Sequence, residues 1–293
     1  MLAGLCTCTL TGLTLPDHEV IIQATDVAGN STNSAITDFS LDAAGSTLYV
    51  SPTGSDAGSN DCLTSGTPCK TFAYALPKLD PGETLMLKDG TYTSGTTGLL
   101  TIDCVAQNLK QGTASQRITV KAQNSRAARI NGYVAGFNTA KLHNCSYWNI
   151  ENIVFAKQSF QADGSNSTGY AIDIKYSPNL IFRGNLVLGV TGGDPLCATS
   201  RPGVLAIRDD SDNALVEENE IYGFAHNGMN FKYNKNGIAR RNYADAREGA
   251  PCTVGGGHSA MINYPGGGWI WENNIGSLSG VSTGSSVGCS SYS

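Results

Sequence analysis

The stretch Leu180-Ile181-Phe182-Arg183-Gly184-Asn185 recurs along the chain, and each copy ends in asparagine. The later copies are Ala214-Leu215-Val216-Glu217-Glu218-Asn219, Gly237-Ile238-Ala239-Arg240-Arg241-Asn242 and Trp269-Ile270-Trp271-Glu272-Asn273-Asn274, with a looser copy at Trp148-Asn149-Ile150-Glu151-Asn152. The last four asparagines are spaced by 34, 23 and 32 residues. Repeats of this length predict a solenoid, in which each unit buries its apolar face on its neighbours.

A second short segment precedes each of the main copies. These segments are Ala171-Ile172-Asp173-Ile174-Lys175, Leu205-Ala206-Ile207-Arg208, Met229-Asn230-Phe231-Lys232 and Ala260-Met261-Ile262-Asn263. Apolar and polar residues alternate in them, which is the period of a strand rather than of a helix. Two or three short strands per turn predict an all-β fold, the right-handed parallel β-helix. The alternative is a β-sandwich with Asn-rich turns, but sandwich repeats rarely return the same corner residue in register.

The recurring asparagines are expected to form a structural ladder. Its members would be Asn185, Asn219, Asn242 and Asn274. Asparagine suits a corner because it tolerates left-handed backbone angles and bonds its own chain. Stacked amides can also hydrogen-bond from one coil to the next.

Composition narrows the classes of function. The chain has 293 residues, 35 of them glycine, and a net charge of −5. That charge and the lack of a basic run argue against nucleic acid as the partner. No apolar run is long enough to span a membrane.

Nine cysteines predict an oxidising compartment, so the protein is expected to be secreted or at the cell surface. Cys62 and Cys69 close a short loop and are expected to form a disulfide. Further pairings stay open at this point. They are Cys197 with Cys252, Cys104 with Cys145, and Cys6 with Cys8 or a distant partner, with Cys289 left over.

Residues 1–44 differ from the rest of the chain. The alternating segment from His18 to Asp26 is followed by Val27-Ala28-Gly29-Asn30. This pattern resembles the last strands of a bacterial immunoglobulin-like or fibronectin-type module. It implies a partial module and further domains of a larger secreted protein; the alternative is a strand pair that caps the solenoid. Residues 45–293 would form the β-helix, and their Ser/Gly-rich end predicts that the solenoid is cut short there.

A second resemblance begins at Leu48. Leu48-Tyr49-Val50-Ser51-Pro52-Thr53-Gly54-Ser55-Asp56 is followed by Thr67-Pro68-Cys69-Lys70-Thr71-Phe72, Pro81-Gly82-Glu83-Thr84-Leu85 and Asp89-Gly90-Thr91-Tyr92. This segment resembles the start of secreted right-handed parallel β-helix proteins, a superfamily that includes pectate-lyase-like, alginate-lyase-like and chondroitinase-B-like enzymes. It implies a short helix over 72–79 that covers an open first coil beginning at Leu85. The resemblance implies the architecture and not an activity.

The alternation also predicts a column of cations. Lys175, Arg208 and Lys232 would point outward at one position of successive coils, with Asn263 at that position in the next coil. Neighbouring strands lie about 4.8 Å apart, so these charges repel by about 1 kcal/mol per pair even in water. An acidic polysaccharide along the solenoid would relieve the repulsion. The alternative is pairing with local acids, for which the chain offers Asp173, Asp209, Asp210, Asp212 and Glu217.

Cleavage of an acidic glycan by β-elimination needs a cation that neutralises the uronate carboxylate, a base that removes the C5 proton and a donor that protonates the leaving oxygen. Lys232-Tyr233-Asn234-Lys235-Asn236 resembles the segment that carries the base in the alginate-lyase-like group, which implies Lys232 as the base. Tyr233 replaces the serine of that pattern, and the next coil has Asn263 and Tyr264 where arginine is expected. The second catalytic residue therefore stays open. Arg208 would bind the carboxylate, because its fork matches that group.

Three further groups complete the predicted site. His226 is a candidate proton donor, with a turn residue as the alternative. Tyr264 is a candidate platform for sugar stacking. The run Asp209-Asp210-Ser211-Asp212 offers oxygen ligands for calcium, as does Asp194, although such a run is more often a solvated turn.

These observations predict an extracellular β-helix protein that recognises a polysaccharide, with cleavage of an acidic one by β-elimination as the sharper hypothesis. A non-enzymatic surface or adhesive solenoid is the first alternative. A glycoside hydrolase is the second, and it would need two carboxylates across a groove, for which Asp173 with Asp209 or Glu217 is the available pair.

Overall fold

The structure is a computed structural model. It describes residues 45–132, 139–157, 170–189, 204–224, 227–246, 259–264 and 266–277, and the backbone of strands within 17–40 and 289–291. The chain divides into two compact units, Met1–Ala44 and Gly45–Ser293. In the described residues no helix has the length and apolar character that crossing a membrane requires.

The first unit contains two antiparallel strand pairs. β1 (Asp17–Val20) pairs with β4 (Thr37–Ser40), and β2 (Gln23–Thr25) pairs with β3 (Ser31–Asn33). The Val27-Ala28-Gly29-Asn30 segment connects β2 to β3 and lies outside the described residues. The immunoglobulin-like character of this unit stays a prediction.

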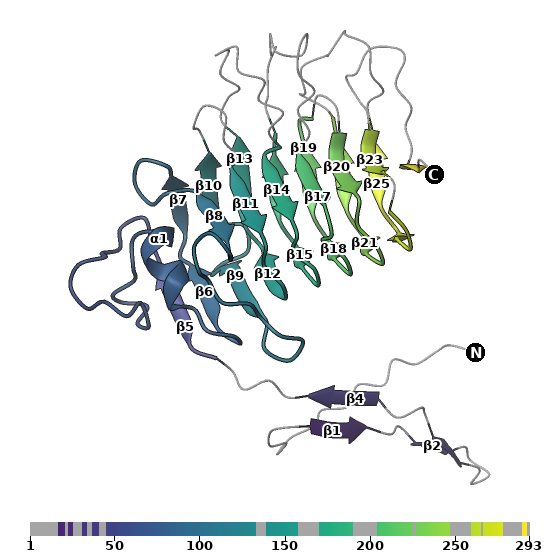
Figure 1. Ribbon diagram of the computed structural model, residues 1–293, viewed down its shortest axis with the longest axis horizontal. Coiled ribbons are helices and arrows are strands. Elements are labelled where there is room, and N and C mark those ends of the chain that lie inside the picture. The colour runs from purple at the N-terminus through teal and green to yellow at the C-terminus, as the bar shows by residue number, and fades with distance from the viewer. Residues whose placement is uncertain are drawn as a thin grey trace. The chain divides into compact units, whose positions relative to one another are not determined.

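The second unit is a right-handed parallel β-helix built from three sheets, as the sequence predicts (Figure 1). The first sheet contains, in spatial order, β5 (Thr47–Val50), β6 (Thr84–Leu87), β9 (Ile118–Ala122), β12 (Trp148–Glu151), β15 (Ile181–Arg183), β18 (Leu215–Glu217), β21 (Ile238–Arg240) and β24 (Ile270–Glu272). The second contains β7 (Gly90–Thr93), β10 (Ala128–Gly132), β13 (Val154–Lys157), β16 (Leu186–Leu188), β19 (Glu220–Tyr222), β22 (Tyr243–Asp245) and β25 (Ile275–Ser277). The third contains β8 (Leu100–Asp103), β11 (Ala140–His143), β14 (Ile172–Lys175), β17 (Leu205–Arg208), β20 (Asn227–Lys232), β23 (Ser259–Asn263) and β26 (Cys289–Ser291).

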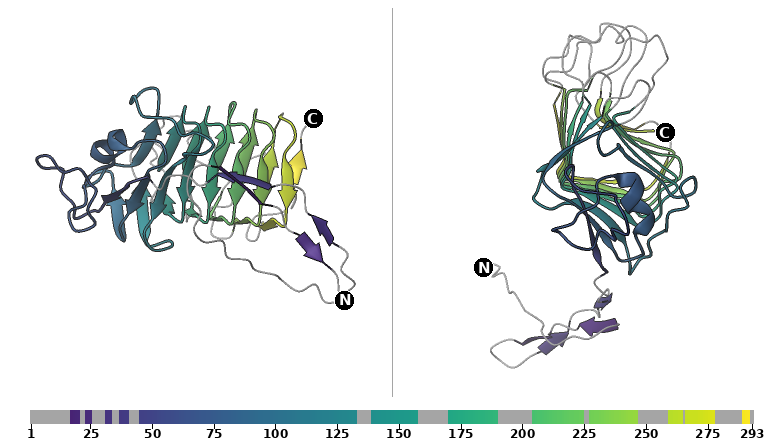
Figure 2. Two further views of the ribbon diagram at one scale, coloured as in Figure 1. Left: turned by 90° about the horizontal axis from the view of Figure 1, so that it is seen from below. Right: turned by 90° about the vertical axis from the view of Figure 1, so that its left-hand side faces the viewer.

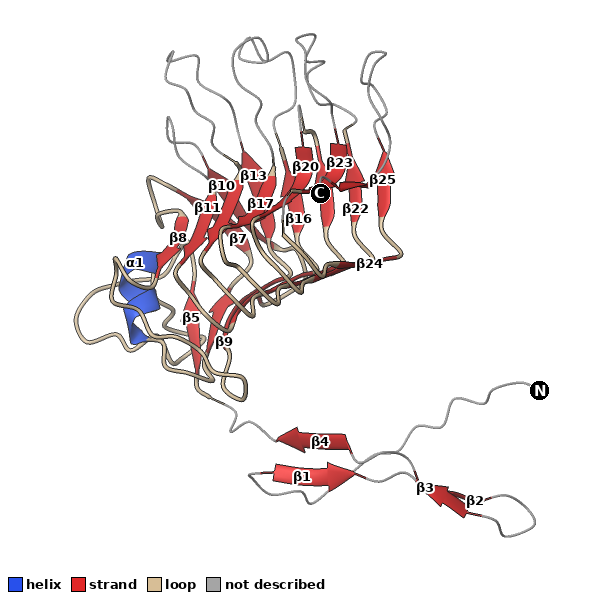
Figure 3. Cartoon of the chain, turned by 45° about the vertical axis from the view of Figure 1, so that its right-hand side comes forward, coloured by secondary structure: helices blue, strands red, loops and turns tan. Residues whose placement is uncertain are grey.

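Each coil therefore contributes three strands. The recurring Asn-terminated segments form the first sheet, the alternating segments before them form the third sheet, and a short strand after each asparagine forms the second. In the right-hand view of Figure 2 the strands of successive coils overlie one another. The colouring of Figure 3 shows that strands and loops alternate regularly from coil to coil. The side chains at one position of the repeat consequently form columns along the solenoid.

The solenoid begins with a covered edge. β5 already pairs in parallel with β6, so the stack starts one strand earlier than the expected beginning at Leu85. The predicted helix is a short α1 (Phe72–Ala75) followed by a 3-10 turn, η1 (Leu76–Lys78), that contains Pro77. The ring of Phe72 stacks on Tyr92 at 5.4 Å, and a disulfide joins Cys62 to Cys69. A second disulfide joins Cys104 to Cys145.

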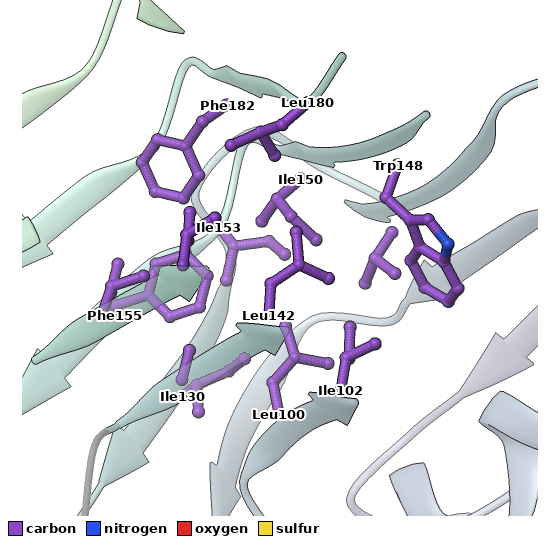
Figure 4. Packing of buried hydrophobic residues seen from close by; sticks show 14 of the residues in the cluster. Leu100, Ile102, Ile130, Leu142, Trp148, Ile150, Ile153, Phe155, Leu180 and Phe182 are labelled. Carbon is purple, nitrogen blue, oxygen red and sulfur yellow. The ribbon is translucent and has the colours of Figure 1, made fainter. Parts of the chain in front are cut away.

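The interior is filled by the inward half of each alternating strand. Trp148, Phe155 and Phe182 are fully buried, and the last two rings stack at 6.1 Å. Figure 4 shows these rings packed among isoleucines and leucines of all three sheets. Because a coil is too small to enclose a core by itself, each apolar side chain depends on the coils above and below it.

Buried asparagines connect the coils at the corner between the first and second sheets. Asn185 Nδ2 donates to Asn219 Oδ1 at 3.2 Å, Asn219 Nδ2 to Asn242 Oδ1 at 2.9 Å, and Asn242 Nδ2 to Asn274 Oδ1 at 2.9 Å. The same oxygens accept the backbone N–H of the preceding coil, for example that of Asn185 at 3.0 Å. One amide thus satisfies several polar groups that the solenoid would otherwise bury without partners.

The left-handed backbone angle lies one residue before the ladder and not on it. Gly184, Glu218, Arg241 and Asn273 have φ between 52° and 67°. In the looser copy Asn152 has φ 60°, and the ladder position itself is Ile153, whose N–H donates to Asn185. The expectation that the ladder asparagines adopt left-handed angles is therefore wrong. Their side chains point inward, so the bend falls to the exposed neighbour.

Removal of one ladder amide should destabilise the whole stack. In Asn219→Ala, the N–H of Asn185 loses its acceptor and the carbonyl of Phe182 loses its donor. Each unsatisfied buried group costs roughly 1–3 kcal/mol, so we expect a loss of about 3 kcal/mol in the free energy of unfolding, measured in urea. Asn124→Ala, which removes an exposed amide bonded to Asp89, should change it by no more than about 0.5 kcal/mol. Equal effects of the two variants would contradict this account.

Candidate functional site

The outer face of the third sheet carries the predicted column of cations. Lys175 pairs in register with Arg208, and Arg208 with Lys232. The column extends back through His143, which pairs with Lys175. It thus runs across four neighbouring strands at one level of the solenoid.

Asn263 does not belong to this column. It pairs in register with Phe231, on the inward half of the alternation, and its Oδ1 is buried with no hydrogen-bond partner in the described part of the chain. Lys232 is instead followed in the next coil by Tyr264, whose N–H donates to the carbonyl of Phe231. The register differs by one residue from the expectation because the buried Met261 pairs with the buried Met229, which places Asn263 opposite Phe231 and Tyr264 at the outer level.

Two of the three cations are matched by local acids. Arg208 Nε and Nη2 donate to the two oxygens of Asp173 at 2.8 and 3.1 Å. Lys175 Nζ lies 3.6 Å from Asp209 Oδ2, and Arg208 Nη1 lies 3.4 Å from the same oxygen. The bidentate edge of Arg208, which was expected to bind a substrate carboxylate, therefore faces Asp173.

Lys232 has a different environment. Its Nζ lies 4.9 Å from the ring centroid of Tyr233 and 5.3 Å from that of Tyr264. No carboxylate of the described residues lies within ion-pair distance of it. The two ring faces hold the ammonium group by cation–π attraction. Lys232 is consequently the cation of the column whose charge an external anion can match.

His143 in β11 also belongs to this site, although the sequence did not lead us to predict it. Its Nε2 lies 3.0 Å from Asp173 Oδ2. Burial raises the pKa of the Asp173 carboxyl, but hydrogen bonds from His143 and Arg208 outweigh this effect and hold the pKa below its usual range. Asp173 therefore stays ionised and joins β11 to β17. The alternation of Lys141, Leu142 and His143 was the signal that would have placed this histidine outward.

Tyr170, two residues before the start of β14, was also missed. Asn230 Nδ2 donates to its hydroxyl at 2.9 Å, and the Arg208 guanidinium lies 5.6 Å from its ring centroid. Burial raises the pKa of Tyr170, more than the nearby Arg208 charge lowers it. The phenol therefore keeps its proton at neutral pH and can donate a hydrogen bond while accepting the one from Asn230. No repeat or motif marks position 170, so the role of this residue could not be predicted from the sequence.

Outward residues of the third sheet are unusually buried. The exposed fractions are 5% for Asp173, 0% for Ala206 and 4% for Asn230. On the first sheet the outward Ile181 and Leu215 remain partly exposed, and Ile270 is 50% exposed. The polar side chains of Asp173 and Asn230 are therefore covered by neighbouring parts of the chain, as is that of Glu217 on the first sheet, which is 2% exposed.

The outer face of the first sheet carries a column of alternating charge. In register it contains Lys121, Glu151, Arg183, Glu217, Arg240 and Glu272. Glu217 accepts from Arg183 and Arg240 at 2.6 Å each. Glu217 and Asp173 thus lie on different sheets, and both are already ion-paired, so the structure does not bring this pair of carboxylates together for glycoside hydrolysis.

The predicted calcium ligands do not converge. Asp209 is engaged by Lys175 and Arg208, and Asp212 accepts the N–H of Lys235 at 2.7 Å. Within the described ranges no group of three or more His, Cys, Asp or Glu side chains could hold a metal ion. Calcium binding by Asp209, Asp210 and Asp212 stays a prediction.

Several predictions fall outside the described residues. They concern His226, Asp194, Cys6, Cys8, Cys197 and Cys252. For Cys289 only the backbone of β26 is described.

Comparisons with known proteins add the following findings. No family model matches the sequence, and no curated protein matches it. Among solved structures, the chain is similar to pectate lyase Pel9A, with 16% identity, a TM-score of 0.43 and coverage of 76% of this chain and 64% of that chain. A GH136 lacto-N-biosidase from Eubacterium ramulus has 14% identity, a TM-score of 0.42 and coverage of 78% and 56%. A mannuronic acid specific polysaccharide family 6 lyase from human gut microbiota has 15% identity, a TM-score of 0.42 and coverage of 79% and 58%.

This chain thus spans between 56% and 64% of the length of these three structures. At this level of identity and superposition the likeness carries no argument about what the chain binds or does. The residues on the outer face of the third sheet are the evidence that bears on function.

The ion pairs of Asp173 predict an acid-sensitive contribution to stability. Its pKa is lower in the folded protein than in the unfolded chain, so its contribution is present above the unfolded value of about 3.9 and is lost as the pH falls through the lower folded value. We expect Asp173→Asn to lower the free energy of unfolding at neutral pH and to flatten its decline below about pH 4. Denaturant unfolding between neutral pH and strong acid measures both effects. Asp61→Asn, on an exposed loop, should leave the pH profile unchanged, and an unchanged profile in Asp173→Asn would contradict the assignment.

Proposed function

We propose that the outer face of the third sheet binds an extracellular acidic polysaccharide that lies along the stacked strands. The supporting observation is Lys232, a cation held between two tyrosine rings without a carboxylate of the described residues beside it. Its neighbours in the column are matched by Asp173 and Asp209. An anionic group on a sugar would supply the missing partner, and the rings offer apolar faces to the sugar itself.

Buried polar groups beside Lys232 support a specific ligand rather than a general ion-exchange surface. Tyr170 and Asn230 form a hydrogen-bonded pair on the same face, and Arg208 lies against the tyrosine ring. Asn230 and Lys232 are two residues apart on one strand, so their side chains leave the same face about 6.6 Å apart. A carboxylate at Lys232 and a hydroxyl group at Tyr170 would fit one sugar unit and its neighbour.

The finer proposal is β-elimination. For this step Lys232 would first have to release its proton to the solvent. The neutral amine would then take the C5 proton of a uronate, the C4–C5 double bond would form as the C4–O bond breaks, and the leaving oxygen would take a proton from the solvent or from a donor such as His226. Arg208 donates both hydrogen bonds of its bidentate edge to Asp173. It would therefore stabilise the substrate carboxylate through its positive charge rather than through two direct hydrogen bonds. A secreted or cell-surface location is part of this proposal, and the two disulfides support it.

The alternative of a non-enzymatic adhesive solenoid is supported by the local pairing of Lys175 and Arg208. On that hypothesis the column is a solvated face, and Lys232 has no special role. Measurements of binding and of product formation separate the two hypotheses.

We expect wild-type protein to bind at least one of alginate, pectate, chondroitin and a heparin-like glycan. In Lys232→Ala the affinity for that glycan should fall roughly tenfold, since a hydrogen bond to a charged group contributes about 1.5–3 kcal/mol. Isothermal titration calorimetry measures the affinity. Ultraviolet absorbance of unsaturated products, lost in the same variant, would establish elimination.

Lys121→Ala is the matched control, because it removes the same charge from the outer face of the first sheet. Its affinity should equal that of the wild type. Equal losses in both variants would show that only net charge matters, and the absence of binding to every glycan would reject the proposal in favour of the adhesive solenoid.

A further inference from the structure

Two exposed tyrosines follow the cation column where the third sheet turns toward the first. Tyr176 comes directly after Lys175, and Tyr233 directly after Lys232. Their residues are 48% and 52% exposed, among the more exposed large hydrophobic residues of the described chain. Because β14 and β20 both pair with β17, the two tyrosines are separated by two strand spacings, or about 9.6 Å.

The backbone at both positions is left-handed. Tyr176 has φ 50° and Tyr233 has φ 56°. A bulky side chain is rare in this region, and such a conformation costs of order 1–3 kcal/mol. The equivalent corners of other coils are occupied by Asn144 at φ 57° and Asp209 at φ 51°, which are residue types that adopt this conformation readily.

The fold therefore needs the left-handed turn but not the tyrosine. The ring of Tyr233 contacts Lys232, and the Tyr176 side chain makes no hydrogen bond, ion pair or ring contact among the described residues. Half-exposed rings also recover little hydrophobic free energy from burial. Neither packing nor backbone preference explains why two of these corners carry an aromatic residue.

We propose that Tyr176 and Tyr233 form a two-ring platform on which sugars of an extended acidic polysaccharide stack, with the polymer axis parallel to the solenoid. The equal backbone angles project both rings from the same side of the corner. One strand spacing is close to the length that one sugar adds to an extended glycan, so the rings would contact alternate sugars. Asp209 lies between them with its charge matched by Lys175 and Arg208, so it does not repel the intervening anionic sugar.

This inference rests on the proposed function and adds a second set of contacts, at the corner after the third sheet. Two linked contacts strengthen binding more than one, because the second is formed within an existing complex. An oligosaccharide long enough to reach both rings should therefore bind more tightly than one that reaches a single ring.

The decisive experiment measures stability and affinity in the same variants. Tyr176→Asn and Tyr233→Asn place a residue suited to left-handed φ at each corner. If the rings serve a ligand, each variant should have a Tm about 2–4 °C higher, as relief of about 1 kcal/mol implies for a chain of this size. Each should also bind the tightest glycan of the panel roughly five- to tenfold more weakly, as expected for the loss of one aromatic contact.

Two matched variants serve as controls. Tyr176→Phe keeps the ring and should retain the wild-type affinity within about twofold. Tyr147→Asn changes a third left-handed tyrosine, at φ 56° and against Arg117, outside the platform. It should leave the affinity unchanged.

A lower Tm with unchanged affinity in Tyr176→Asn and Tyr233→Asn would make the rings structural and overturn the inference, while wild-type binding through Lys232 would still support the proposed function. If the wild type binds no glycan of the panel, the proposed function and the platform both fail. Higher Tm with weaker binding is the outcome that supports the platform.

Discussion

The hydrogen bond from one coil to the next is the constraint on which this molecule depends. Strands of three or four residues cannot form a stable sheet alone, and they persist here because each inner strand of a sheet is bonded on both edges. The buried amide ladder applies the same principle at the corner, where backbone groups would otherwise lack partners. Once the coils are held in register, every position of the repeat becomes a column, and the chemistry of the surface is decided by which residues share a column.

The three sheets use this property differently. The first sheet alternates acid and base, so its charges are matched within the column. The third sheet places cations side by side and matches two of them by acids from an adjacent column and from the corner. What remains is the ammonium group of Lys232 between two rings, on the same strand as Asn230, whose side chain donates to Tyr170. The candidate site is thus a local departure from charge balance on a repetitive scaffold.

Periodicity in the sequence was sufficient for the fold, because a repeat with strand alternation has few other ways to bury its apolar face. It also predicted that Lys175, Arg208 and Lys232 share a level, since a parallel register follows from the repeat. Periodicity did not predict the position of Asn263 correctly. The register between β20 and β23 differs by one residue from the expected one, and this difference moves the Asn263 side chain inward. Tyr170 and its bond to Asn230 could not be predicted, because the contact joins residues 60 apart and depends on how a loop returns to the sheet. The left-handed backbone angle was predicted for the ladder asparagines, but it lies on the residue before each of them. Residue types alone do not show which of two adjacent corner residues adopts this angle and which forms the hydrogen bonds between coils.

On the proposed function, a charged polymer approaches a protein whose first sheet carries a column of alternating charge. The potentials of neighbouring opposite charges cancel within a few ångströms, so the outer face of the first sheet exerts little electrostatic force on an approaching molecule. With a net charge of −5, the whole molecule repels a polyanion at long range, and on the proposed function the third sheet would attract it at short range. Moderate salt should then shorten the reach of the repulsion and speed encounter, even as it weakens the final contact. The association rate would pass through a maximum with ionic strength instead of falling throughout, as it does for ligands drawn in by an oppositely charged protein.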